Sequence, residues 1–177
     1  MKLCVSAAAA VLAAVCAVSE GATFGRLRSA ARQAARGEAE LLGENRAAAG
    51  YFSELLRGLP ANATKAKQEV VIAKLEAEVS RLSDNVKKIK GIEKSDAAHE
   101  KDSEKLKASM SGKDREMMDK MDVWSKRMNE KAKVGALDVM SKLKNAIHLI
   151  KKGALSGNTD AQARLNDVLQ HMSAMAR

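Results

Sequence analysis

The most regular pattern in this sequence is a run of aliphatic residues at alternating spacings of three and four. We call these six positions the seam: Ile72, Leu75, Val79, Leu82, Val86 and Ile89. Positions spaced in this way share one face of an α-helix, whereas a strand would repeat every second residue. The pattern predicts a helix over about residues 64–90 with a short, coiled-coil-like apolar face.

The seam covers fewer than three heptads, and its flanking positions offer few opposite-charge pairs for a parallel partner. These flanking residues are Val71, Glu76, Glu78, Ser83, Asn85 and Lys90. Pairing between flanking charges sets partner choice in coiled coils. We therefore expect the seam to be closed mostly within the chain.

The rest of the chain also favours helices. It contains one proline and 2% aromatic residues, and it is rich in Ala, Lys, Glu, Met and Leu. These abundant residues are helix formers, and the clusters of aromatic and β-branched residues that favour strands are missing. The composition predicts an all-α fold of four or five helices, arranged as a loose bundle or an extended helical hairpin.

Glycine, proline and capping residues predict where the helices end. A helix over residues 44–57 should end at Gly58 and Pro60, and the seam helix should end at Gly91. A charged segment from Ser95 to about residue 116 is then either a solvent-exposed helix or a mobile linker. The apolar pattern returns at residue 117 and resumes after Gly135.

The last helix follows a loop over residues 153–158. Thr159 and Gln162 form a capping-box pattern at its start. One face of this helix carries Leu165, Val168, Met172 and Met175.

Residues 1–19 have the pattern of a signal peptide. Lys2 precedes an unbroken run of apolar and small residues over 3–18, which is short and alanine-rich for a bilayer-spanning helix. Small residues place the cleavage site after Ser19, with Ala17 as the alternative. A retained anchor or a buried alanine helix is the other interpretation. Both cysteines, Cys4 and Cys16, lie in this leader, so cleavage would leave no thiol in the mature chain.

Residues 20–60 form an arginine- and alanine-rich segment. The stretch TFGRLRSAARQAAR at 23–36 holds four arginines and no acid. It resembles an organelle transit peptide, and behind a signal peptide it resembles the bipartite leaders of algae with complex plastids. A solvated alanine helix is the alternative, and residues 61–177 then form a lysine-rich helical domain.

We expect the mature protein to begin near Glu20, because signal peptidase cuts after small residues. If residues 23–36 are a transit peptide, the N-terminus should instead fall near residues 37–44. Mass spectrometry of the protein from its native source measures this directly. A soluble protein that retains Met1 would contradict the leader prediction.

Residues 139–152 are the strongest candidate for binding an anionic surface or a partner's groove. Val139 and Met140 share an apolar face with Leu143, Ile147 and Ile150, whereas Lys142, Lys144, Lys151 and Lys152 supply four charges with no acid in the span. A basic amphipathic helix of this kind can lie on an anionic membrane or enter a groove. The alternative is a bundle helix with lysines on its outer face.

Asn62 begins an Asn-Ala-Thr sequon and is a candidate N-glycosylation site. Asn62 can alternatively be the N-cap of the following helix. Eight of the nine methionines fall after residue 109. Methionine suits adaptable binding surfaces, but the stripe of Met117, Met121, Trp124 and Met128 is expected to pack into the core.

No catalytic, metal or cofactor site is predicted. The three histidines, His99, His148 and His171, are scattered, and neither a Gly-rich phosphate loop nor a Gly-x-Ser-x-Gly motif is present. An enzyme would need a polar pocket that brings His148 or His171 against carboxylates.

The sequence therefore predicts a non-enzymatic, secreted or lumenal helical protein. It would act through helix–helix contacts with a protein partner or with itself. The alternative is a cationic amphipathic protein that binds a membrane surface, a polysaccharide or a nucleic acid. The net charge of +9 permits this, but the basic residues alternate with acids and only four aromatics are available to stack on bases. Nucleic acid is therefore the least favoured of these ligands.

Overall fold

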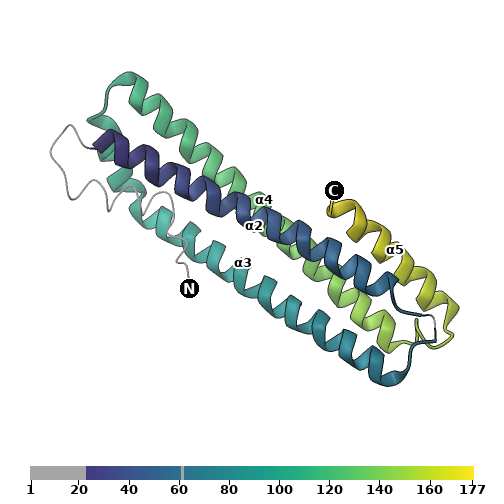
Figure 1. Ribbon diagram of the computed structural model, residues 1–177. Coiled ribbons are helices and arrows are strands. Elements are labelled where there is room, and N and C mark those ends of the chain that lie inside the picture. The colour runs from purple at the N-terminus through teal and green to yellow at the C-terminus, as the bar shows by residue number, and fades with distance from the viewer. Residues whose placement is uncertain (1–22, 61) are drawn as a thin grey trace. The chain divides into compact units, whose positions relative to one another are not determined.

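The computed structural model describes residues 23–60 and 62–177. Side chains are described from residue 40 onward, except at residues 61, 95, 96, 98–103 and 106. The described residues contain no strand and form four helices (Figure 1), which are α2 (Thr23–Arg57), α3 (Lys65–Ala108), α4 (Gly112–Lys151) and α5 (Thr159–Met175). The all-α prediction is confirmed. Both cysteines and the cleavage sites after Ala17 and Ser19 lie outside the described residues.

Helix α2 ends where the sequence predicts. Its last residue is Arg57, and the N–H of Gly58 donates to the carbonyl oxygen of Glu54 at 3.0 Å. Pro60 follows and cannot continue the helix. The helix begins at Thr23 rather than near residue 44, so the arginine-rich stretch at 23–36 is part of the same continuous helix.

The predicted break at Gly91 is wrong, because α3 continues through it to Ala108. Ser95 therefore lies within the helix and not at the start of a new one. Glycine in a helix costs about 1 kcal/mol relative to alanine, but it keeps the backbone N–H that proline lacks, so the hydrogen-bond ladder can continue. The segment from 93 to 116 is accordingly helical, apart from the turn at residues 109–111.

Helix α4 likewise continues through Gly135. A Cβ at this position would lie 3.5 Å from Nδ2 of Asn45, which is a buried residue of α2. This is an ordinary van der Waals distance, so packing does not require glycine here, and Gly135 does not interrupt the helix.

The predicted loop at 153–158 is present, but its capping residue differs. Gly153 ends α4 with φ +92°, and the N–H of Ala154 donates to the carbonyl oxygen of Leu149 at 3.1 Å. This is the Schellman arrangement that favours glycine. The N-cap of α5 is Asn158, whose side chain accepts from the N–H of Ala161 at 3.1 Å. Thr159 is the first helical residue, so the predicted Thr159–Gln162 capping box does not form.

Contacts divide the chain into two compact units. Unit 1 comprises Met1–Leu41 and Lys87–Ala132, and unit 2 comprises Leu42–Val86 and Lys133–Arg177. Each of the three long helices, α2, α3 and α4, has one stretch in unit 1 and another in unit 2, whereas α5 belongs to unit 2 alone. We describe each unit separately.

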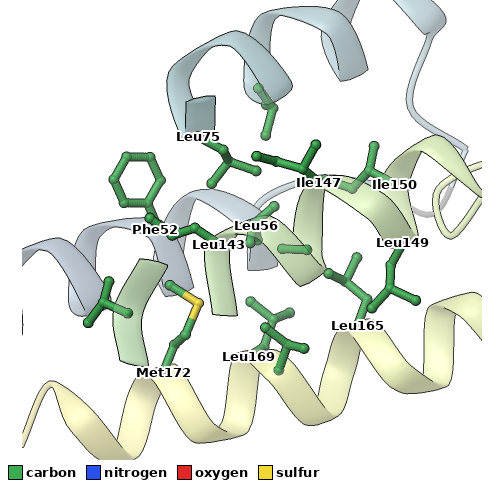
Figure 2. Packing of buried hydrophobic residues seen from close by; sticks show 14 of the residues in the cluster. Phe52, Leu56, Leu75, Leu143, Ile147, Leu149, Ile150, Leu165, Leu169 and Met172 are labelled. Carbon is green, nitrogen blue, oxygen red and sulfur yellow. The ribbon is translucent and has the colours of Figure 1, made fainter. Parts of the chain in front are cut away.

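Unit 2 contains the hydrophobic core. Every residue of the connected cluster of buried apolar side chains lies in this unit. Figure 2 shows Leu165, Leu169 and Met172 of α5 directed toward the buried side chains of α2 and α4. The predicted apolar face of the last helix is therefore confirmed at Leu165, Val168 and Met172, which are buried, while Met175 is half-buried.

Most of the seam contributes to this core. Leu75 and Leu82 are completely buried and Val86 is nearly so, whereas Ile72 and Val79 are half-buried. Ile89, the last seam residue, is buried in unit 1. Four of the six seam residues are therefore buried, and the two half-buried ones pack against the core.

Unit 1 contains a helical hairpin. Its α3 and α4 stretches are joined by the turn at 109–111. Among the side chains described in this unit, the buried ones are the apolar Ile89, Met118 and Ala132 and the polar Lys107 and Asn129. Polar groups are therefore a larger share of the buried side chains described here than of those in unit 2.

Candidate functional site

The apolar face of residues 139–152 is not available to a membrane or a partner. Val139, Leu143 and Ile150 are at most 1% exposed, Ile147 is also buried, and Met140 is packed against the core. Figure 2 shows Leu143 and Ile147 among side chains from the neighbouring helices. This face closes the core of unit 2.

The four lysines of this stretch do not form one surface. Lys151 pairs with Glu76 of α3, with Nζ 3.1 Å from Oε1. Lys144 is exposed on the same flank, since seven residues correspond to two helical turns. Lys142 and Lys152 lie on the opposite flank, where they line a groove with α5. The structure therefore separates the predicted patch into two pairs of lysines.

The sequon is exposed at its asparagine. Asn62 lies in the turn between α2 and α3 and its side chain is exposed. Helix α3 begins at Lys65, and the N–H of Gln68 donates to the carbonyl oxygen of Thr64 at 3.0 Å. Thr64 therefore precedes the helix, and the alternative that Asn62 is its N-cap is wrong.

The methionine stripe of α4 is not in the core. Met117 and Trp124 are 43% and 41% exposed, and Met121 and Met128 are only half-buried. The prediction that this stripe is packed inside is wrong. The buried residues of this part of α4 are instead Met118, Asn129 and Ala132, and the half-buried Asp122 and Ser125 lie between them at spacings of four and three.

A continuous exposed line therefore runs along α4 in unit 1. We call it the basic-apolar line: Lys113, Met117, Lys120, Trp124, Arg127 and Lys131, at alternating spacings of four and three. All six side chains are exposed. Of its four cations, Lys120 forms an ion pair on its own helix, 2.6 Å from Glu116. The line presents two large apolar side chains between basic ones.

A buried ammonium group, that of Lys107, lies next to the turn at 109–111 that joins α3 and α4 in unit 1. We call Lys107 with Glu104, Asp119 and Asp122 the Lys107 cluster. The side chain of Lys107 is only 7% exposed, and its Nζ lies 2.8 Å from Asp119 Oδ1, 2.8 Å from Asp122 Oδ2 and 3.2 Å from Glu104 Oε1. The cluster links the last turn of α3 to the second and third turns of α4.

The charges of the Lys107 cluster shift one another's titration. Burial alone would lower the pKa of Lys107, but the bonds to Asp119, Asp122 and Glu104 outweigh it and raise the pKa above its ordinary value. The hydrogen bond from Lys107 lowers the pKa of the Asp119 carboxyl. Sequence reasoning missed this cluster, because its members stand in a segment rich in lysines and acids. The spacing of Asp119 and Asp122 on one face was the available signal.

The groove between α4 and α5 brings together both histidines of unit 2. His148 of α4 and His171 of α5 line it, together with Asp160 and Asp167. The His171 ring is bonded to a backbone group, since its Nδ1 lies 2.8 Å from the carbonyl oxygen of Asp167. The groove has no serine, threonine or cysteine in its lining that would serve as a nucleophile.

Among the residues that the structure describes, no group of three or more His, Cys, Asp and Glu side chains is arranged to hold a metal ion. None of the helices in this part of the chain combines the length and apolar character needed to cross a bilayer.

Comparison of this chain with models of protein families, with curated proteins and with solved structures found no match.

Proposed function

We propose that this protein is a non-enzymatic helical interaction protein that binds an acidic amphipathic helix of a partner through the basic-apolar line of α4. The observation that carries the proposal is the exposure of Met117 and Trp124 at 43% and 41%. Large aromatic and Met side chains are enriched at protein interfaces, and Trp is enriched among the residues that contribute most to binding.

The other apolar faces support this choice by elimination. The seam and the 139–152 face are mostly buried within the chain. We propose that the seam closes an intramolecular helical bundle and is not a site for a partner. The basic-apolar line is the exposed face with a heptad repeat long enough to guide a helix, since it spans residues 113–131.

The charges of the line favour an acidic partner. Lys113, Lys120, Arg127 and Lys131 alternate with its apolar residues, so glutamates on a partner helix would complement them. A second copy docking through the same line would place like charges against each other, which is destabilising. We therefore expect a heterologous helix on this surface.

The single tryptophan of the chain is the reporter for the test. The test uses a synthetic peptide of four heptads, with leucine at the a and d positions and glutamate at the e and g positions. Binding of this peptide should shift Trp124 fluorescence to shorter wavelength, because the side chain leaves water. Replacing all four basic residues of the line with glutamine should weaken binding roughly tenfold or more, since each exposed ion pair contributes about 0.2–1 kcal/mol.

The matched control carries glutamine at Lys142, Lys144, Lys151 and Lys152, which removes four lysines elsewhere on the same helix. It should bind the peptide almost as wild type does. A peptide with lysine in place of glutamate should not bind. If the acidic peptide leaves the fluorescence of wild type unchanged, the proposal is wrong.

The alternative function, binding of an anionic surface, is a distinct outcome of the same assay. Leu143, Ile147 and Ile150 are buried, so the 139–152 face has no apolar side chains to insert into a bilayer. The basic-apolar line exposes only two large apolar side chains, Met117 and Trp124. We therefore expect no fluorescence shift with vesicles of phosphatidylserine and phosphatidylcholine at physiological salt. If Trp124 fluorescence shifts with vesicles but not with the acidic peptide, the ligand of the basic-apolar line is a membrane and not a partner helix.

We also propose that the protein acts in the secretory pathway lumen or outside the cell, with a complex plastid as the alternative. This proposal rests on the sequence of residues 1–36, and the N-terminal mass measurement tests it.

A further inference from the structure

Unit 2 has a polar groove on its surface with an unusual set of charges. It lies between the C-terminal part of α4 and α5, has a volume of about 590 Å³, and is lined from both helices. We propose that this groove binds a small polyanion that carries several sulfate or phosphate groups. The proposal is independent of the basic-apolar line, which belongs to unit 1.

Unpaired cations on the groove are the first support. Lys142 and Lys152 line it, and neither forms an ion pair with any residue that the structure describes. By contrast Lys151, on the other flank of the same helix, is already paired with Glu76. A lysine with no carboxylate partner is free to pair with an oxyanion.

Helix α5 contributes the third permanent cation. Arg164 lies in the groove, where its Nε is 3.2 Å from Oδ2 of Asp160. This ion pair uses one edge of a guanidinium group that has five N–H donors, so donors remain for a ligand. The planar donor array of arginine suits sulfate and phosphate oxygens.

His171 of α5 also lines the groove, and its ring is held by a backbone group. A backbone carbonyl only accepts hydrogen bonds, so Nδ1 of His171 must be the donor to Asp167 O. This bond fixes the orientation of the ring at the edge of the groove.

The charged residues that line the groove have both signs. Lys142 of α4 and Lys152, the residue after this helix, are on one side. Helix α5 contributes Asp160, Arg164 and Asp167. Three cations therefore oppose two carboxylates, and the balance favours an anion.

The size of the groove favours a small ligand. Sites for small molecules typically have volumes of about 300–1,000 Å³, which includes this groove. The neighbouring apolar residues Leu143 and Ile150 are buried in the core and leave nothing to insert into a membrane. The geometry therefore suits a sulfated sugar or a polyphosphorylated polyol.

Calorimetric titration of the full chain with two defined probes tests the proposal. Sucrose octasulfate represents a sulfated sugar, and inositol hexakisphosphate represents a phosphorylated polyol. Tighter binding of one identifies the source of the oxyanion groups. Lys142→Gln with Lys152→Gln should weaken binding about tenfold or more, because two charges at contact distance are removed.

The control is Lys144→Gln with Lys151→Gln, which removes the same charge from the opposite flank of the same helix. It should leave the affinity within about twofold. Circular dichroism confirms that both variants fold. Equal weakening by both pairs of substitutions would show that the ligand responds only to the net charge of the protein, and the proposed groove site would then be wrong. The proposal would also be wrong if neither probe bound.

Discussion

Replacing Leu82 with alanine should lower the free energy of unfolding by about 2–5 kcal/mol, which is the usual cost of deleting a buried leucine side chain. Leu82 has 0% exposure and belongs to the connected core of unit 2. Its removal would leave a cavity among side chains from several helices, and packed interiors relax only partly around such a cavity. Urea denaturation followed by circular dichroism measures the change.

Leu137 is the matched control for this substitution. It is also a leucine on a helix of unit 2, but it is 46% exposed. Leu137→Ala should therefore change the stability by about 0.5 kcal/mol or less. If the two variants lose equal stability, Leu82 does not occupy the core.

Replacing Lys107 with methionine should destabilise the hairpin of unit 1 by about 1–2 kcal/mol. Removal of one partner from a fully buried ion pair costs about 3–5 kcal/mol. The carboxylates here are partly exposed, however, which reduces the effect. Hydrogen exchange of the amides in residues 104–122 measures the loss locally, because unit 2 lacks this cluster.

The pH dependence of the hairpin provides a second measurement. The pKa of Asp119 is lowered from 3.8 by Lys107. Its contribution to stability is therefore complete above pH 3.8 and is lost as the pH falls through the lower, folded-state pKa. Wild type should lose protection of residues 104–122 below about pH 4, and Lys107→Met should show little of this loss.

Lys120→Met is the control for Lys107. Lys120 pairs with Glu116 at 2.6 Å, but both side chains are mostly exposed. Exposed pairs of this kind typically contribute about 0–1 kcal/mol. An equal effect of the two substitutions would mean that burial gives the Lys107 cluster no special role.

The candidate sites could be predicted from the sequence only in part. The pattern over residues 139–152 predicts a basic amphipathic helix, and α4 covers this stretch up to Lys151. A sequence shows which residues share a face but not whether another part of the chain covers that face. Leu143 and Ile150 were covered, while Met117 and Trp124 were left exposed. The exposed line and the groove could be found only when neighbouring helices were in place.

The sequence by itself determined the secondary structure class and the strongest helix ends. Helix-forming composition with a single proline leaves few alternatives to helix. Gly58 with Pro60, and Gly153 with φ +92°, end helices for local reasons, since proline cannot continue the hydrogen-bond ladder and glycine adopts positive φ at little cost. Such effects act within a few residues and need no tertiary contact.

Only the tertiary structure decided at which glycines a helix continues and which stripe of α4 is buried. Gly91 and Gly135 carry a helix penalty of about 1 kcal/mol each, which packing along a long helix outweighs. At Gly135 a Cβ would lie 3.5 Å from Nδ2 of Asn45, which is an ordinary contact distance. In unit 1 the half-buried Asp122 pairs with the buried Lys107 on the inner side of α4, while Met117 and Trp124 are exposed. These outcomes depend on contacts between residues far apart in the chain, whose energies no local pattern contains.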